Sequence, residues 1–241
     1  MITYCTFTDK GDREINEDSV GVFDNGDKYC FVVCDGLGGH GRGEVASALV
    51  VDVLMDQFYK SEELVNFIGQ ALETAQHRLT KKQMAENKAH EMKTTVVVMA
   101  IDENMVYIGH VGDSRLYVFV NGRLKRKTTD HSVPGMLAMT REIRDDEIRG
   151  HPDRNLLLRV MGVEWEEPMY EMGLPVQLKK GMAFLLCTDG FWEYIDEATM
   201  RKTLKKSRTP EQWRDAMAEI VRHNGMGNNM DNFSAVAVFC K

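Results

Sequence analysis

Four aspartates stand where apolar, strand-like runs of the sequence end. One such aspartate is ordinarily a turn residue, because Asp-Gly and Asp-Asn are favoured turn dipeptides. If several strand ends meet at one end of a sheet sandwich, however, their carboxylates lie close together and repel one another unless cations offset the charge. The segments are VVCDGLGG, GHVGDSR, LLCTDGF and NNMDNFS, with Asp35, Asp113, Asp189 and Asp231, and INEDS adds Asp18 near the N-terminus.

The surroundings of these aspartates indicate which cation they would bind. Oxygen ligands without paired histidines or cysteines select hard ions such as Mg²⁺ or Mn²⁺ rather than zinc. The small neighbours Gly36 and Gly190 leave room for a main-chain carbonyl or a water molecule to reach the ion. The sequence therefore predicts a hard-cation site built from residues far apart along the chain.

Arg13 lies in DKGDREINED, close to Glu17 and Asp18. It has two interpretations: a surface arginine paired with Glu14 or Glu17, worth less than ~1 kcal/mol, or a planar fork that binds a phosphate group beside the metals. Cations together with an arginine suit phosphoryl transfer to water, because a metal-bound water is a nucleophile near neutral pH and the positive charges offset charge on the transferred group.

The glycine-rich segment offers a competing interpretation. Gly36, Gly38 and Gly41 spell G-x-G-x-x-G after an apolar strand and before a helix, which is the pattern of a dinucleotide-binding turn. Asp35 directly precedes it, an unfavourable place for a pyrophosphate without a metal, and the next predicted element is a second helix instead of a strand ending in an acidic ribose ligand. We reject a dinucleotide-binding domain.

Two histidines and two basic runs have weaker interpretations. His40, in the glycine-rich loop, is a candidate proton donor to a leaving alkoxide, against the alternative of an ordinary hydrogen-bonding loop residue. His131, in TTDHS, is expected to order a loop. The basic runs 123–127 and 202–208 are interpreted as solvated faces, with docking of an acidic phosphoprotein as the alternative.

The periodicity of apolar residues predicts the elements that position these side chains. A helical period covers 44–59 and 61–86, and Ser61 followed by acidic residues predicts the second helix start. Two more helices are predicted at 196–205 and 210–224, and a partly helical polar segment from 130 to about 162. Strands are predicted at 3–8, 19–23, 29–34, 94–101, 105–112, 114–120, 122–128, 169–174, 182–187 and 233–239, with Asn121-Gly122 as a hairpin turn. Sequential strands with hairpin turns favour a sandwich of two antiparallel sheets with helices outside.

Composition narrows the class further. The chain has 241 residues, 43% of them hydrophobic, and no repeat or linker, so we expect one soluble domain. A net charge of −7 argues against nucleic acid as a partner. The five cysteines contain no CxxC pair, which argues against a disulfide framework or a zinc site and favours a reducing cytoplasm. No secretory signal and no apolar run of ~18 residues is visible, so we expect no membrane partner.

Seven ordered motifs between Asp9 and Val238 resemble one known family. DKGDREINEDS, VVCDGLGGHGRGE, GHVGDSRLY, TTDHS, HPDRNLLLRVMG, LLCTDGFWEYI and GNNMDNFSAVAV are similar to motifs of the type 2C, or PPM, metal-dependent protein phosphatases, above all the compact bacterial members. The resemblance implies an α+β fold, a four-layer αββα sandwich, forming one catalytic domain over residues 1–241. It implies hydrolysis of phosphoserine and phosphothreonine by attack of a metal-bridging water, and a cytoplasmic monomer that reverses a bacterial Ser/Thr kinase, its partners being that kinase and its phosphorylated substrates.

The resemblance also assigns roles at two Mn²⁺ or Mg²⁺ ions and a third, weaker one. Asp35 would bridge the two ions, the Gly36 carbonyl would bind one, and Asp189 and Asp231 would complete the other. Asp18 would support bound waters, Asp113 would hold the third ion, Arg13 would bind the substrate phosphate, and the segment 132–159 would be a flap over the cleft.

Two departures from the family pattern concern the cleft. Leu37 stands where some members carry a histidine, which leaves His40 as the candidate acid, and Phe191-Trp192 is bulkier than usual and is expected to shape the neighbouring pocket. The alternatives are a catalytically silent domain of the same fold and a phosphatase acting on a small phosphorylated metabolite.

Overall fold

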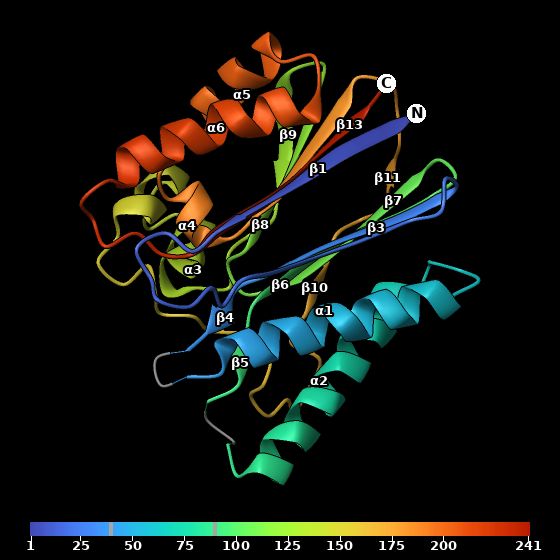
Figure 1. Cartoon of the computed structure of the whole chain (residues 1–241), viewed down its shortest axis with the longest axis vertical. Helices are drawn as coiled ribbons and strands as arrows, with labels where there is room; N and C mark the ends of the chain where they lie inside the picture. The colour runs from blue at the N-terminus through green and yellow to red at the C-terminus, as the bar shows by residue number, and fades with distance from the viewer. Residues whose placement is uncertain (39–40, 89–90) are drawn as a thin grey trace.

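The computed structural model describes residues 1–38, 41–88 and 91–241. Two antiparallel sheets stack face to face, and helices cover the outer face of each sheet (Figure 1). Both termini lie at one end of the sandwich, and the helix α4 (Asp189–Trp192) lies toward the opposite end. The predicted αββα sandwich is confirmed.

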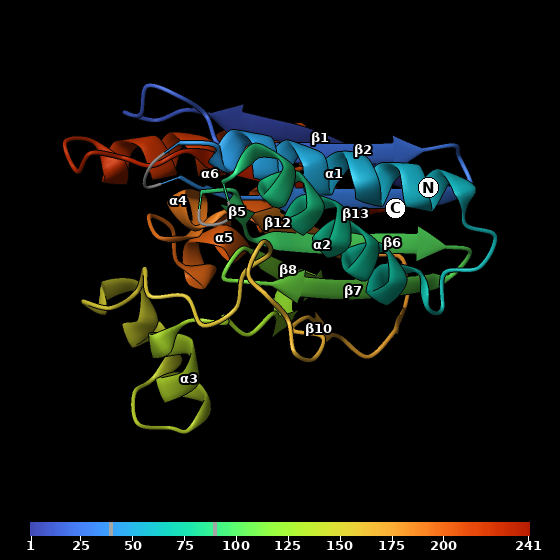
Figure 2. The ribbon, with the colours of Figure 1, turned by 90° about the horizontal axis from the view of Figure 1, so that it is seen from below.

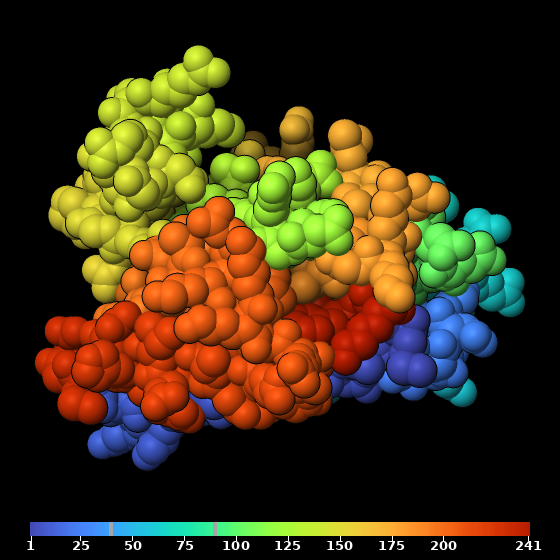
Figure 3. Space-filling view, turned by 90° about the horizontal axis from the view of Figure 1, so that it is seen from above, coloured from blue at the N-terminus to red at the C-terminus, as the bar shows by residue number. Residues whose placement is uncertain are grey.

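The first sheet has five strands and carries the C-terminal helices. Its outer face is covered by α5 (Glu197–Lys206) and α6 (Pro210–Gly225) (Figure 3). Its strand order is β1 (Ile2–Asp9), β13 (Phe233–Cys240), β12 (Met182–Cys187), β8 (Arg115–Val120) and β9 (Arg123–Lys127).

The second sheet carries the helices α1 (Gly43–Lys60) and α2 (Phe67–Glu86) on its outer face (Figure 2). A separate pair, β4 (Gly36–Leu37) and β5 (Lys93–Thr94), leads from this sheet toward the helices. The sheet order is β10 (Glu171–Met172), β7 (Met105–Val111), β6 (Val96–Asp102), β3 (Lys28–Cys34) and β2 (Ser19–Asp24), with β11 (Val176–Gln177) also paired to β7.

Three apolar cores separate the four layers, which explains why the central strands are apolar without interruption. In β3, Cys30 and Val32 pack beneath α1 and α2, whereas Phe31 and Val33 pack between the sheets. Successive strand residues point to opposite faces, so a strand covered on both faces needs apolar residues at every position. The same alternation holds for β12, where Phe184 lies between the sheets.

The remaining elements form a lobe beside the first sheet (Figure 2). This lobe contains α3 (Val133–Met139) and the 3₁₀ helix η1 (Asp145–Gly150), so the predicted partly helical segment after residue 130 is confirmed. We call residues 132–159 the flap segment. Ser132 accepts a hydrogen bond from the Gly135 N–H at the start of α3, the usual role of a serine at this position.

The turn predicted at Asn121-Gly122 is confirmed, with φ of 49° and 69° at the two residues, as a two-residue hairpin of this type requires. The helix start predicted at Ser61 is wrong, because α2 begins at Phe67. The Ser61 hydroxyl donates to the Glu63 carbonyl, so it forms a local turn instead of accepting from a helix N–H.

The strand predicted at 169–174 is reduced to the two residues of β10, which lie at the sheet edge against Gly109 and His110. Because β3 is followed by two helices and then by β6 antiparallel to it, the glycine-rich turn does not belong to a βαβ unit, in agreement with the rejected dinucleotide site. Among the described residues, no helix combines the length and apolarity needed to cross a membrane.

Candidate metal and phosphate site

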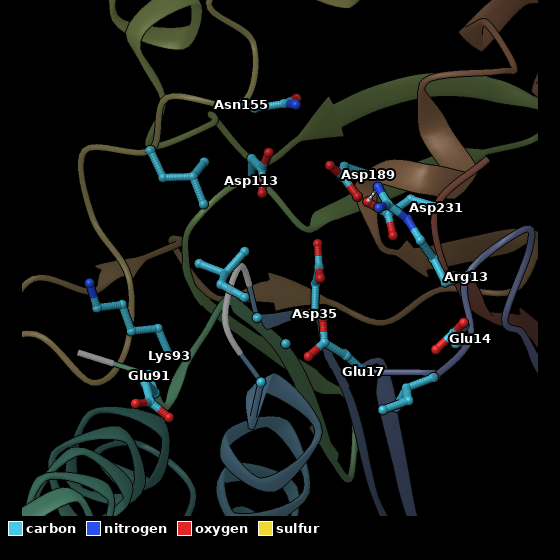
Figure 4. Close-up of a pocket in the computed structure, with 16 residues that line it drawn as sticks. Arg13, Glu14, Glu17, Asp35, Glu91, Lys93, Asp113, Asn155, Asp189 and Asp231 are labelled. Carbon is cyan, nitrogen blue, oxygen red and sulfur yellow. Dashed lines mark hydrogen bonds and ion pairs between the residues drawn. The ribbon is translucent and has the colours of Figure 1, made fainter. Parts of the chain in front are cut away.

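A cleft of about 840 Å³ collects the aspartates that the sequence singles out. Arg13, Gly36 and Leu37 also line it, together with Asn155 and Leu157 of the flap segment. Figure 4 shows the carboxylates converging from separate loops. The aspartates that line this cleft are Asp35, Asp113, Asp189 and Asp231, so their predicted convergence is found.

Asp35 follows β3 and is held through its main chain. Its N–H donates to the Thr95 hydroxyl at 3.1 Å, and its carbonyl accepts from the Thr95 N–H at 2.9 Å and from the Thr94 hydroxyl at 2.7 Å. The Thr95 hydroxyl also lies 2.7 Å from the Ser114 hydroxyl, next to Asp113. One threonine therefore ties together the loops that carry Asp35 and Asp113.

Gly36 needs to be glycine because the chain passes too close for a side chain. A Cβ at Gly36 would lie 2.4 Å from the Gly43 carbonyl oxygen and 2.5 Å from that of Glu17. The Gly36 N–H donates to the Glu17 carbonyl at 3.1 Å. The close approach places the start of α1 against the Asp35 loop.

Asp113 is 5% exposed and follows Gly112, whose φ of 101° suits glycine. His131 bonds Gly112 twice: the His131 N–H donates to the Gly112 carbonyl at 3.0 Å, and His131 Nδ1 accepts the Gly112 N–H at 3.2 Å. The Asp113 carbonyl accepts the Trp192 indole N–H at 3.0 Å. His131 thus orders the loop of Asp113, in line with the expectation for it.

Asp189 begins α4, and Asp231 lies just before β13. Asp189 accepts the Gly190 N–H at 2.6 Å, and Asp231 accepts the Asn232 N–H at 2.8 Å. The other Asp231 oxygen accepts from the Arg13 guanidinium at 3.0 Å, as the dashed line in Figure 4 marks. A surface pairing of Arg13 with Glu14 or Glu17, the alternative considered from the sequence, is not formed, because the chain fold brings Asp231 beside it.

Asn232 is a residue of the site that the sequence motifs did not single out. Its side-chain amide donates to the carbonyls of Lys10 and Ile15 at 2.9 and 3.0 Å, and its oxygen accepts the Glu17 N–H at 2.7 Å. These bonds hold the loop that carries Arg13 against the loop of Asp231. The only sequence signal is the adjacency of Asn232 to an aspartate, since the partner loop lies more than 200 positions away along the chain.

Asp18 lies behind the cleft and is almost fully buried. One carboxylate oxygen accepts the Thr188 hydroxyl at 2.9 Å, and Thr188 in turn accepts the Ser234 N–H at 2.9 Å. Within the described part of the protein, the other Asp18 oxygen has no hydrogen-bond partner. A buried carboxylate oxygen without a partner is costly and suits a residue that faces a solvated cation.

Burial raises the pKa of the carboxyls of Asp18, Asp35, Asp113 and Asp189, and repulsion from neighbouring carboxylates raises each further. The pKa of Asp18 reaches about 8 and that of Asp189 about 7. The pKa values of Asp35 and Asp113 are also raised, by burial first and by the neighbouring carboxylates second. Only added positive charge would ionise all four together near neutral pH. The all-oxygen donor set and the unpartnered Asp18 oxygen therefore fit Mg²⁺ or Mn²⁺.

Gly36 lines the cleft, where its carbonyl would have to lie in order to bind a cation. His40 falls outside the described residues. The bulky pair at the end of α4, expected from the sequence to shape the neighbouring pocket, is not among the residues that line the cleft. Phe191 and Trp192 are fully buried, at 0% and 1% exposure, because α4 packs them into the core beneath α5 and α6.

A second group of possible ligands is His110, His131 and Glu171, whose nearest donor atoms lie within 4.8 Å of one another. The two imidazole rings stack with centroids 4.5 Å apart and planes 16° apart. The nitrogen lone pairs of the two rings lie in these nearly parallel planes, so they do not converge on one metal position. Because His131 Nδ1 already accepts the Gly112 N–H, its Nε2 carries the proton in the neutral ring. We assign no metal to this group.

Comparison with known proteins agrees with this geometry. The family model described as Protein phosphatase 2C matches residues 10–233. The serine/threonine phosphatase stp of Listeria innocua is 34% identical over 239 residues, which cover 96% of this chain and 93% of the relative. The PstP protein phosphatase of Mycobacterium tuberculosis is 27% identical over 95% of this chain and 44% of its own length.

Solved structures show the same fold. The serine/threonine phosphatase Stp1 from Staphylococcus aureus has a TM-score of 0.89 and 30% identity, covering all of this chain and 96% of its own. The PstP catalytic domain in complex with two manganese ions has a TM-score of 0.82 and 25% identity, covering 99% of this chain and 97% of its own. Because the family model matches from residue 10 to residue 233 and the aspartates of its motifs meet in one cleft, the chain belongs to the protein phosphatase 2C family.

Proposed function

We propose that this protein is a metal-dependent serine/threonine protein phosphatase. The observation that carries the proposal is the cleft in which buried aspartates of raised pKa lie beside a solvent-accessible arginine. An acidic cluster binds cations, and an arginine fork binds an anion. A site that contains both is suited to phosphate-ester hydrolysis.

The aspartates have separate roles in this proposal. Asp35, between the loops of Asp18, Asp113 and Asp189, would bridge two Mn²⁺ or Mg²⁺ ions, and the Gly36 carbonyl would bind one of them. Asp189 and Asp231 would bind the other ion, Asp18 would accept hydrogen bonds from metal-bound waters, and Asp113 would hold a weaker third ion. When bound, the cations would supply a water that is nucleophilic near neutral pH and would offset phosphoryl charge.

Arg13 would bind the phosphate of the substrate. In the structure its guanidinium is paired with Asp231, and both side chains are about half exposed. A cation bound to Asp231 would satisfy that carboxylate, so the arginine would be free to turn two of its N–H groups toward a phosphate in the cleft. Asn232, which fixes the loop of Arg13, would keep the fork at this position.

The proposal also needs a residue that donates a proton to the leaving alkoxide. Leu37 lines the cleft and offers no proton. His40 is the sequence candidate, and its contribution is tested directly by His40→Ala. Loss of turnover with a phosphopeptide, but not with p-nitrophenyl phosphate, would support this role, because nitrophenolate leaves without a proton.

The substrates we propose are phosphoserine and phosphothreonine in proteins, and the partners are a Ser/Thr kinase and its substrates in the cytoplasm, with the phosphatase acting as a monomer. The relatives named as serine/threonine phosphatases support this substrate class. A catalytically silent domain is disfavoured, because Asp35, Asp113, Asp189 and Asp231 all line the cleft.

The experiment measures phosphate release from phosphoserine and phosphothreonine peptides in millimolar Mn²⁺ or Mg²⁺, with EDTA as the control. Turnover that requires the metal is expected, and its absence from peptides and from p-nitrophenyl phosphate overturns the proposal. A panel of phosphorylated metabolites, run at equal concentrations, tests the alternative substrate class, which would hold if a metabolite exceeds the peptides in kcat/KM.

A further inference from the structure

The flap segment is attached to α4, the short helix that begins with Asp189. Arg149 of η1 donates from Nε to the Trp192 carbonyl at 2.9 Å and from its terminal nitrogen to Glu197 at 2.9 Å. Arg154 forms an ion pair with Glu193, which directly follows α4. Two arginines of the flap segment therefore hold the C-terminal end of α4.

Trp192 is fixed from several sides at once. The guanidinium of Arg115 lies 3.4 Å from the centroid of its ring, within the range of a cation–π contact. Arg115 is fully buried and donates two bonds to Asp130, at 2.8 and 2.6 Å. A buried, bidentate arginine–carboxylate pair has one strongly preferred geometry, so it provides a rigid support for the indole.

The indole of Trp192 is connected to the cleft by one hydrogen bond. Its N–H donates to the Asp113 carbonyl at 3.0 Å, across 79 positions of sequence. The Asp35 carbonyl, by contrast, accepts from both the main chain and a hydroxyl of the neighbouring threonines. The Asp113 peptide thus depends on a side chain of α4, while Gly112 beside it is held by His131.

We propose that Trp192 is a positioning residue for Asp113, and that it couples the flap segment to the weakest of the cation sites. Trp192 is not among the residues that line the cleft, so its indole would act on a cation only through Asp113. Its hydrogen bond orients the Asp113 peptide, from which the carboxylate enters the cleft. Arg115 holds the indole ring, and Arg149 holds the main chain of Trp192. For its consequence in catalysis this inference rests on the proposed function.

The experiment compares Trp192→Phe with Trp213→Phe as a matched control. Trp213 is also fully buried, and its N–H also donates to a main-chain carbonyl, that of Met200, at 3.0 Å, but it packs against α5 away from the cleft. Both variants keep an aromatic ring and lose one indole–carbonyl hydrogen bond. Any general loss of stability should therefore be similar in the two.

Mn²⁺ binding is measured by calorimetry in the absence of substrate, with Asp113→Asn as the reference for loss of the weakest site. Since one hydrogen bond is at stake, Trp192→Phe should raise the Kd of the weakest ion about three- to tenfold and leave the tighter ions unchanged. Trp213→Phe should bind Mn²⁺ as the wild type does. Arg149→Lys, which loses the bond to the Trp192 carbonyl, should shift the same Kd in the same direction.

Several results would overturn the inference. They are an unchanged weakest Kd in Trp192→Phe, an equal shift in Trp213→Phe, or no Mn²⁺ site that Asp113→Asn weakens. If Trp192→Phe does not fold, an unchanged Kd in Arg149→Lys has the same meaning. Because calorimetry requires no turnover, a shifted Kd in a protein without phosphatase activity would sustain this inference and refute the proposed function.

Discussion

Replacing Arg13 separates its role in phosphate binding from any role in the fold. The Arg13–Asp231 pair is 3.0 Å long, with side chains 45% and 49% exposed. Exposed pairs of this kind contribute at most about 1 kcal/mol. Arg13→Ala should therefore change the free energy of unfolding by less than about 1 kcal/mol.

The effect on catalysis should be much larger. Hydrogen bonds to a charged group contribute about 1.5–3 kcal/mol, which corresponds to about 10- to 150-fold in kcat/KM. We expect the loss mainly as a higher KM, because the fork binds phosphate before the reaction as well as during it. Arg13→Lys keeps the charge and loses the two-pronged geometry, so it should fall between Arg13→Ala and the wild type.

The assay is steady-state hydrolysis of a phosphothreonine peptide at saturating Mn²⁺, with urea denaturation of each variant in parallel. Arg222→Ala is the control, since Arg222 forms a comparably exposed pair with Asp9 at 2.9 Å and does not line the cleft. A kcat/KM for Arg13→Ala within twofold of the wild type refutes the assignment of Arg13 to phosphate. So does an equal loss in Arg222→Ala.

Three further predictions concern the carboxylates. Asp231→Asn should abolish Mn²⁺-dependent turnover and lower the Mn²⁺ content measured by calorimetry, because it removes a ligand charge. Asp130→Asn should lower the free energy of unfolding by about 3–5 kcal/mol in urea, since it leaves the buried Arg115 without its carboxylate. In EDTA, the free energy of unfolding should decrease as pH rises from about 4 to about 8. Burial raises the pKa of Asp18 to about 8 and that of Asp189 to about 7, so the folded protein keeps protons that the unfolded chain has lost, at a cost of about 1.4 kcal/mol per pH unit for each proton.

These predictions have their own controls. Asp146→Asn removes the partner of Arg144, and both side chains are largely exposed, at 71% and 74%, so it should leave the free energy of unfolding nearly unchanged. An equally small change in Asp130→Asn would contradict the argument from burial. Saturating Mn²⁺ should remove the decline of stability between pH 4 and 8, since the cation takes the place of the protons. A metal-free protein that gains stability over that range would contradict the assigned pKa shifts.

Local sequence was sufficient to predict most elements, because burial on both faces leaves a recognisable pattern. Apolar residues without interruption marked β3 and β12, and an Asn-Gly pair marked the β8–β9 turn. The error at Ser61 arose where two local preferences compete: the same hydroxyl suits a helix start or a short turn, and the turn forms. The two-residue β10 lies at a sheet edge, where few contacts constrain the pattern.

For the site, the sequence by itself determined which residues are chemically able to act: aspartates at strand ends, a nearby arginine, and glycines that permit close approach. Only the tertiary structure decided how they are held and paired. Arg13 pairs with Asp231 from the other end of the chain, Asn232 holds the loop of Arg13 through the Lys10 carbonyl, and Trp192 holds Asp113 by its indole. Such contacts depend on how separate loops pack against one another, and a linear pattern carries no record of which loop a side chain will reach.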